Sequence, residues 1–140
     1  MSLFKQFKMD TNKEQNGIEV KYGANDDGTI PTFTLRRISN SNQVYTKTLE
    51  RLSAPYRRLL QLGNLDDRTS NRILITTFCE AVLIGWQNVQ NIKNELIPYS
   101  FDNAMKLLEE LPELYEELRT QAATASLYRD ETLEREAKNL

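Results

Sequence analysis

The stretch RILITTFCEAVLIGWQNVQNIK, residues 72–93, decides the class of fold, because its apolar side chains recur at helical spacing along two adjacent stripes. Such a broad apolar surface predicts a helix that is buried on more than half of its circumference. Gly85 lies inside this predicted helix, where it is expected to permit a close helix crossing. Cys79, the only cysteine, cannot form an internal disulfide and is expected to be a small buried side chain.

On the C-terminal side, the stretch PYSFDNAMKLLEELPEL, residues 98–114, predicts two further helices. Ser100 can cap the first helix, and Asp102 in the first turn is favoured by the helix dipole. The apolar positions of this helix follow at i, i+3, i+4 and i+7, and they are Ala104, Leu107, Leu108 and Leu111. Pro112 is expected to end or bend this helix, and the next helix begins at once.

On the N-terminal side, alternating apolar residues in GIEVKY, residues 17–22, predict a half-buried strand. The turn signal NDDG, residues 25–28, leads into a second β-rich run, TIPTFTL, residues 29–35. Pro31 cannot donate a ladder hydrogen bond, so the second strand is expected to have an open edge there. Helical patterns then occupy residues 40–128.

These patterns predict an α+β, mainly helical fold, with an N-terminal β-hairpin (residues 17–35) followed by a bundle of four to five helices. Hairpin and helices form a single domain over residues 17–128. A flexible lead, residues 1–16, precedes this domain, and a polar tail, residues 129–140, follows it.

The composition of the 140 residues, 39% apolar and 27% charged, is that of a soluble globular protein. The longest unbroken apolar run, AVLIGW at residues 81–86, is far shorter than a membrane span, so no membrane interaction is expected. The N-terminus has no long apolar segment of the secretory type, which favours a cytoplasmic protein.

Catalytic chemistry is not predicted. The chain has no histidine, which removes the usual general base and the commonest zinc ligand, and one cysteine cannot build a thiolate metal site. No glycine-rich phosphate-binding string occurs. We therefore expect a protein that is not an enzyme and that has no catalytic residues, no metal site and no cofactor.

Charge is segregated along the chain. Residues 36–72 contain eight basic and three acidic residues, a balance of +5, whereas residues 95–140 contain eleven acidic and five basic residues, a balance of −6. Three explanations stay open: pairing of two halves of one domain, pairing between neighbouring copies, and recruitment of a different partner by each face. The arginines admit a nucleic-acid-binding regulator, but the pI of about 5.3 and the absence of a known nucleic-acid-binding motif argue against it.

A series of short strings spans residues 78–131, about two fifths of the chain. The strings are Gly85, Trp86 and Val89; Pro98, Tyr99 and Ser100; Leu107 and Leu108; Leu111, Pro112 and Leu114; and Leu127, Tyr128 and Arg129. In their order and spacing they resemble the tail assembly chaperone family of long-tailed double-stranded DNA bacteriophages.

The resemblance implies a non-enzymatic role in tail assembly in the host cytoplasm, with no place in the mature virion. The implied partners are the tape measure protein, which such chaperones coat, and the tail tube protein, which they help to recruit. A chain that stops at Leu140 looks like the short form of this family. A structural virion or tail component and the nucleic-acid-binding regulator stay open as alternatives.

The partner would bind by the helix-in-groove mode, in a groove near Pro112 between the two C-terminal helices. The candidate partner-binding residues are Trp86, Tyr99, Phe101, Leu108, Leu111 and Tyr115. The same side chains also suit the alternative that they pack the domain's own core.

Overall fold

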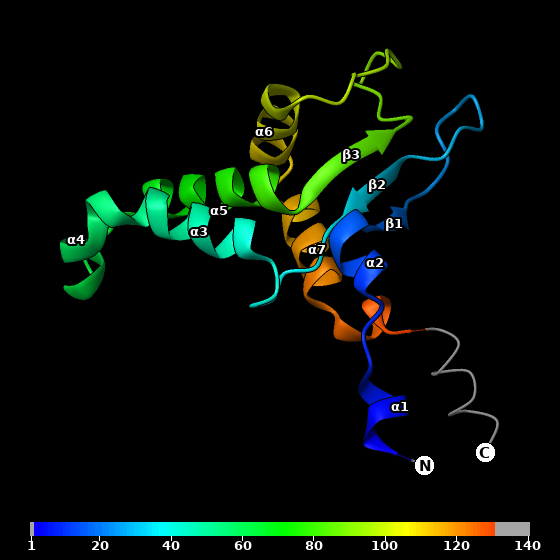
Figure 1. Cartoon of the computed structure of the whole chain (residues 1–140). Coiled ribbons are helices and arrows are strands. Elements are labelled where there is room, and N and C mark those ends of the chain that lie inside the picture. Colours follow the sequence, from blue (N-terminus) through cyan, green and yellow to red (C-terminus); the bar gives the residue numbers. More distant parts are fainter. Residues whose placement is uncertain (1, 131–140) are drawn as a thin grey trace.

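The computed structural model describes residues 2–130, and their fold is α+β and mainly helical, as predicted (Figure 1). The elements follow in the order α1 (Leu3–Phe7), α2 (Thr11–Asn16), β1 (Ile18–Lys21), β2 (Thr32–Leu35), α3 (Gln43–Ser53), η1 (Ala54–Tyr56), α4 (Arg57–Gln61), α5 (Asp67–Ala81), β3 (Leu83–Gln87), α6 (Phe101–Glu110), α7 (Pro112–Ala123) and η2 (Ala125–Tyr128), where η marks a 3₁₀ turn. None of the helices within the described residues is long and apolar enough to cross a membrane.

The predicted hairpin is confirmed. Strands β1 and β2 pair antiparallel, with Ile18 opposite Leu35 and Lys21 opposite Thr32. The connecting loop turns at Gly28, whose φ of +85° is a conformation that side chains other than glycine disfavour. The Gly28 amide donates to the Asn25 carbonyl at 2.9 Å, which closes the predicted turn.

The predicted helix over residues 72–93 is wrong in its second half. Helix α5 ends at Ala81, and the chain continues as β3, which pairs antiparallel with β2 and completes a sheet in the order β1-β2-β3. The physical reason is that a continuously apolar run suits a buried strand as well as a buried helix. The free edge of β2 offers this run backbone partners, which local spacing cannot reveal.

Two expectations about single residues are wrong for the same reason. Strand β2 is the central strand, so it has no open edge, and Pro31 lies just before it. The Pro31 carbonyl accepts a hydrogen bond from the Tyr22 amide at 3.0 Å. Gly85 lies in β3 rather than at a helix crossing, and an added Cβ there would meet no atom within 4 Å.

Helix α6 begins and ends as predicted, and α7 begins as predicted at Pro112 but ends at Ala123, before the 3₁₀ turn η2. The Ser100 hydroxyl accepts from the Asn103 amide at 3.0 Å and caps α6, whose first turn contains Asp102. Helix α6 ends at Glu110, and Pro112 is the first residue of α7, where a missing amide hydrogen costs nothing.

Helices α3 and α5 pack side by side, and together with α4 they extend away from the sheet as an arm (Figure 1). Asn42 anchors the base of this arm. Its side-chain oxygen accepts from the Tyr45 amide at 3.1 Å and caps α3, while its side-chain nitrogen donates to the carbonyls of Arg37 and Ala81. One polar side chain therefore ties the start of α3 to the end of α5.

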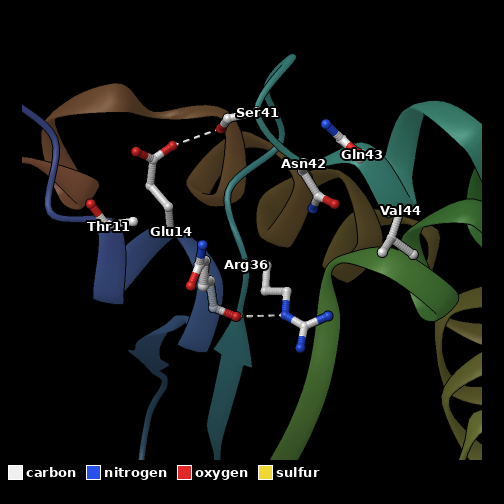
Figure 2. Close-up of a pocket in the computed structure, with 8 residues that line it drawn as sticks. Thr11, Glu14, Arg36, Ser41, Asn42, Gln43 and Val44 are labelled. Carbon is white, nitrogen blue, oxygen red and sulfur yellow. Dashed lines mark hydrogen bonds between the residues drawn. The ribbon is translucent and has the colours of Figure 1, made fainter.

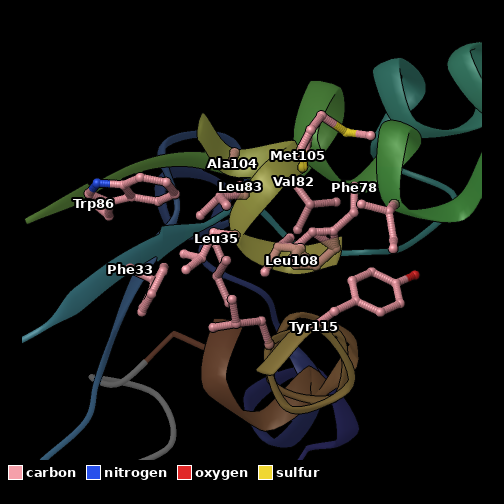
Figure 3. Close-up of a cluster of buried hydrophobic side chains, with 14 of the residues drawn as sticks. Phe33, Leu35, Phe78, Val82, Leu83, Trp86, Ala104, Met105, Leu108 and Tyr115 are labelled. Carbon is pink, nitrogen blue, oxygen red and sulfur yellow. The ribbon is translucent and has the colours of Figure 1, made fainter. Parts of the chain in front are cut away.

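The core lies where the sheet, the end of α5, and helices α6 and α7 meet, and their apolar side chains point toward one another (Figure 3). Phe33 on β2 and Trp86 on β3 form an edge-to-face pair with ring centroids 5.9 Å apart. Cys79 is buried, as predicted. Tyr128 is fully buried, and its hydroxyl donates to the Leu35 carbonyl at 3.0 Å.

The segment before the hairpin contains α1 and α2 and contacts the end of the described chain. The Asp10 amide donates to the Tyr128 carbonyl at 2.8 Å, and the Asp130 amide donates to the Lys8 carbonyl at 3.0 Å. Flexibility of the lead over residues 1–16 stays a prediction. Most of the tail predicted over residues 129–140 lies outside the described residues.

The Tyr128 hydrogen bond can be tested by removing one oxygen atom. We expect Tyr128→Phe to lower the free energy of unfolding by about 1–2 kcal/mol, because the buried Leu35 carbonyl loses a donor. Tyr56→Phe is the matched control, and it should change stability by less than about 0.5 kcal/mol. Urea unfolding of the three proteins measures the difference, and equal effects of the two substitutions would contradict the assignment.

Candidate functional site

A groove of about 530 Å³ opens at the bend between α6 and α7, where the first half of α5 forms its third wall. Its apolar floor consists of Ile75, Leu108 and Tyr115, with Pro112 beside them. Its polar rim carries Arg68, Asn71 and Arg72 from α5 and Glu109 and Glu116 from α6 and α7. The volume lies within the range of small-ligand and side-chain pockets.

The floor is rigid because its side chains are also core residues. Leu108 is fully buried, and Tyr115 packs edge to face on Phe78 with ring centroids 5.4 Å apart. Burial raises the pKa of the Tyr115 hydroxyl to about 12, so this hydroxyl stays protonated even in alkaline solution. A neutral floor of this kind favours an apolar side chain over a charged group.

The rim carries charges of both signs on opposite walls. Arg72 on α5 and Glu109 on α6 form an ion pair at 2.9 Å, and both side chains are largely exposed to solvent. An exposed pair contributes little to stability and can open for a ligand at small cost. Arg68 forms no ion pair among residues 2–130. The arrangement suits a helix with an apolar ridge and charged flanks.

The structure separates the six predicted partner-binding residues. Leu108 and Tyr115 lie together in the floor of the groove. Leu111, 49% exposed, lines a different and smaller pocket of about 180 Å³. Phe101 is exposed at the start of α6.

The other two predicted residues are joined to each other and to the sheet. Trp86 is buried and packs edge to face on Tyr99, with centroids 5.3 Å apart. The indole nitrogen of Trp86 donates to the Ile97 carbonyl, and the Tyr99 hydroxyl donates to the Leu83 carbonyl at 2.9 Å. Trp86 therefore packs the core, which is the alternative that the sequence left open.

Sequence reasoning missed the contribution of α5 to the groove. Arg68 and Arg72 are four residues apart, so they lie on one face of a helix, and Ile75 follows at the next turn. This spacing was a detectable signal. What it could not indicate was that this face of α5 lies opposite Pro112.

A second, polar pocket of about 290 Å³ lies between α2, the end of β2 and the start of α3 (Figure 2). Its charged groups are already paired with neighbouring groups. Glu14 accepts from the Ser41 hydroxyl at 2.8 Å and pairs with Arg37 at 3.2 Å, and Arg36 donates to the Gln15 carbonyl at 2.7 Å. These contacts hold α2 against the base of the arm, which makes the pocket a structural junction.

Residues 2–130 bring together no group of three or more side chains of the types that bind metal ions.

The charge segregation is partly resolved within one chain. Among residues 2–130, the ion pair between Arg72 and Glu109 joins the basic segment to the acidic one. Arg37 pairs with Glu14 and Arg51 with Glu80, which both lie outside the acidic segment. Within the described residues, complementarity of two halves of one domain therefore accounts for a small part of the pattern.

The contribution of the groove floor to stability can be measured by comparing substitutions at the buried Leu108 and the half-exposed Leu111. Leu108→Ala should lower the free energy of unfolding by about 2–5 kcal/mol, because it leaves a cavity at a fully buried site. Leu111→Ala, three residues away at a half-exposed site, should cost less than about 1 kcal/mol. Chemical denaturation measures both values, and similar costs would contradict the assigned burial.

The buried thiol predicts a pH dependence. Burial raises the pKa of the Cys79 thiol from 9.0 to about 12, and the negative charges of the nearby Glu109 and Glu80 make smaller contributions in the same direction. The unfolded chain therefore releases this proton at lower pH than the folded chain, and the free energy of unfolding should fall as the pH rises from 9 toward 12. Cys79→Ala should show a shallower fall across this range. Identical slopes for the two proteins would show that the thiol titrates as an exposed group.

Comparison of the sequence with known protein families identifies a match. The family model described as YdaY prophage protein matches residues 39–139, which include every element from α3 to η2 and therefore all the walls of the groove. No curated protein and no solved structure matches the chain. Because the matched segment covers well over half of the sequence, the chain belongs to the YdaY prophage protein family and is of phage origin.

Proposed function

We propose that this protein is a non-enzymatic tail assembly chaperone, which binds the tape measure protein in the host cytoplasm and helps to bring tail tube subunits to it. The observation that carries the proposal is the groove at the α6–α7 bend, with its apolar floor and charged rim. The phage origin of the family and the string pattern over residues 78–131 support the same role.

The groove suits an amphipathic helix better than it suits a small polar molecule. Its floor presents Ile75 and Tyr115, packed over the fully buried Leu108, to the apolar ridge of a helix, which is the helix-in-groove mode of recognition. A helix that exposes such a ridge in water is prone to aggregate, and covering the ridge removes apolar surface from solvent.

The rim can orient the bound helix. Arg68 and Arg72 lie on the α5 wall, and Glu116 lies on the opposite wall. A helix with acidic residues on one flank and basic residues on the other would be favoured in one direction, because the reversed direction brings like charges together. The exposed rim charges would set the direction of the bound helix and add little to its affinity. A chaperone that must later release its client requires such modest affinity.

The nucleic-acid-binding alternative is weakened by the contacts of its arginines. Arg36 donates to a backbone carbonyl, and Arg37 and Arg72 form ion pairs. Half of the arginines that suggested this function are thus engaged with the protein itself, the full set being Arg36, Arg37, Arg57, Arg58, Arg68 and Arg72. A structural virion component differs from a chaperone in one observable property, since it would be found in purified particles.

The proposal is tested by co-expressing the chain with the tape measure protein of the same phage and passing the soluble fraction over a size-exclusion column. We expect the tape measure protein to become soluble and to co-elute with this chain. Asn71→Trp, which fills the groove from its exposed α5 wall, should weaken co-elution at least tenfold.

Asn71→Ala is the matched control, because it keeps the groove open and should retain co-elution. Circular dichroism of each variant shows whether the fold is intact. If the tape measure protein stays insoluble, or if folded Asn71→Trp solubilises it fully, the chaperone groove is refuted. This chain in purified virions would favour the structural alternative.

A further inference from the structure

The tip of the arm, which we define as residues 56–63, carries exposed apolar and basic side chains together. Leu59, Leu60 and Leu62 on and after α4 are 43%, 46% and 62% exposed. Arg57 and Arg58 lie beside them, and no acidic residue occurs between residues 51 and 65. Within residues 2–130 these two arginines form no ion pair. An exposed cluster of leucines on a projecting element is a mark of an interaction surface.

The complementary surface lies on the same chain, around the start of α7. We define this acidic face by its exposed glutamates, which are Glu109, Glu110, Glu113, Glu116 and Glu117. No basic residue occurs between residues 107 and 118. Leu111, 49% exposed, lies among the glutamates. A shallow depression of about 330 Å³ at Pro112, Glu113 and Glu117 gives the face a concave centre.

The ion pairs within residues 2–130 leave most of the charges on both surfaces unpaired. Glu109 pairs with Arg72 and Glu116 with Arg119, but Glu110 and Glu113 form no ion pair within residues 2–130. The two surfaces match in charge sign, and each contains exposed leucine that association would remove from water. A second copy of the chain carries both an acidic face for the basic arm tip and a basic arm tip for the acidic face. Any other single partner would need two separate surfaces of opposite charge.

We propose that the arm tip of one copy docks on the acidic face of a second copy. The two surfaces are different, so the contact is heterologous, and each bound pair of copies leaves one tip and one face free. Such a contact propagates into a ring or a row rather than closing as a symmetric dimer.

The predicted association is weak and sensitive to salt, because its charges are exposed at the surface. Sedimentation velocity of the purified protein, without a tape measure protein, should show a mean mass that rises with concentration in about 50 mM salt and falls in about 500 mM salt. Because no client is present, this result is independent of the proposed chaperone role. A monomer at every concentration in low salt would overturn the proposal.

Charge reversal provides the decisive experiment. Arg57→Glu with Arg58→Glu makes the tip acidic, and the three changes Glu110→Lys, Glu113→Lys and Glu117→Lys make the face basic, so each variant alone should associate at least tenfold more weakly. A mixture of the two variants pairs an acidic tip with a basic face, and it also pairs a basic tip with an acidic face. Association should therefore return in the mixture, although neither variant associates alone.

The control is Lys21→Glu with Lys93→Glu, which changes the net charge by the same amount as the tip variant at exposed sites outside both surfaces. This protein should associate like the unmodified chain. Circular dichroism confirms that each variant is folded. The proposal fails if the mixture stays monomeric, or if the control weakens association as much as the tip variant does.

Discussion

The pairing of β3 with β2 is the constraint on which the rest of the structure depends. Only Val82 separates the end of α5 from the start of β3, so the helix must lie against one end of the sheet. The Val82 carbonyl accepts a hydrogen bond from the amide of Arg36 at 2.9 Å. This bond ties the connection between α5 and β3 to the residue that follows β2. This short connection fixes the point at which the arm extends from the sheet and the side of α5 that faces the core.

The groove is a consequence of that geometry. Helices α6 and α7 cover the apolar side chains of β2, β3 and α5, and the bend at Pro112 leaves a space that the start of α5 only partly fills. Because Leu108 and Tyr115 also pack the core, the floor is preorganised and loses little side-chain entropy on binding. Substitutions in the exposed rim should therefore cost less stability than substitutions in the buried floor.

The charge pattern has two levels. One exposed ion pair, between Arg72 and Glu109, spans the groove within the chain. In the proposed docking of two copies, the arginines at the arm tip and the glutamates around Pro112 would contribute mainly to orientation and rate of encounter. The proposed assembly role depends on such surfaces.

The sequence by itself determined the local features: the hairpin, the Ser100 cap, the start of α7 at Pro112 and the burial of Cys79, because each depends on neighbouring residues. It also placed Leu108 and Tyr115 near the bend. Tertiary structure alone decided that residues 83–87 form a strand, since a helix and a strand can bury the same apolar run and the free edge of β2 made the choice. It likewise placed Arg68, Asn71 and Ile75 opposite Pro112, because contacts between segments distant in the chain arise from packing, which local spacing does not encode.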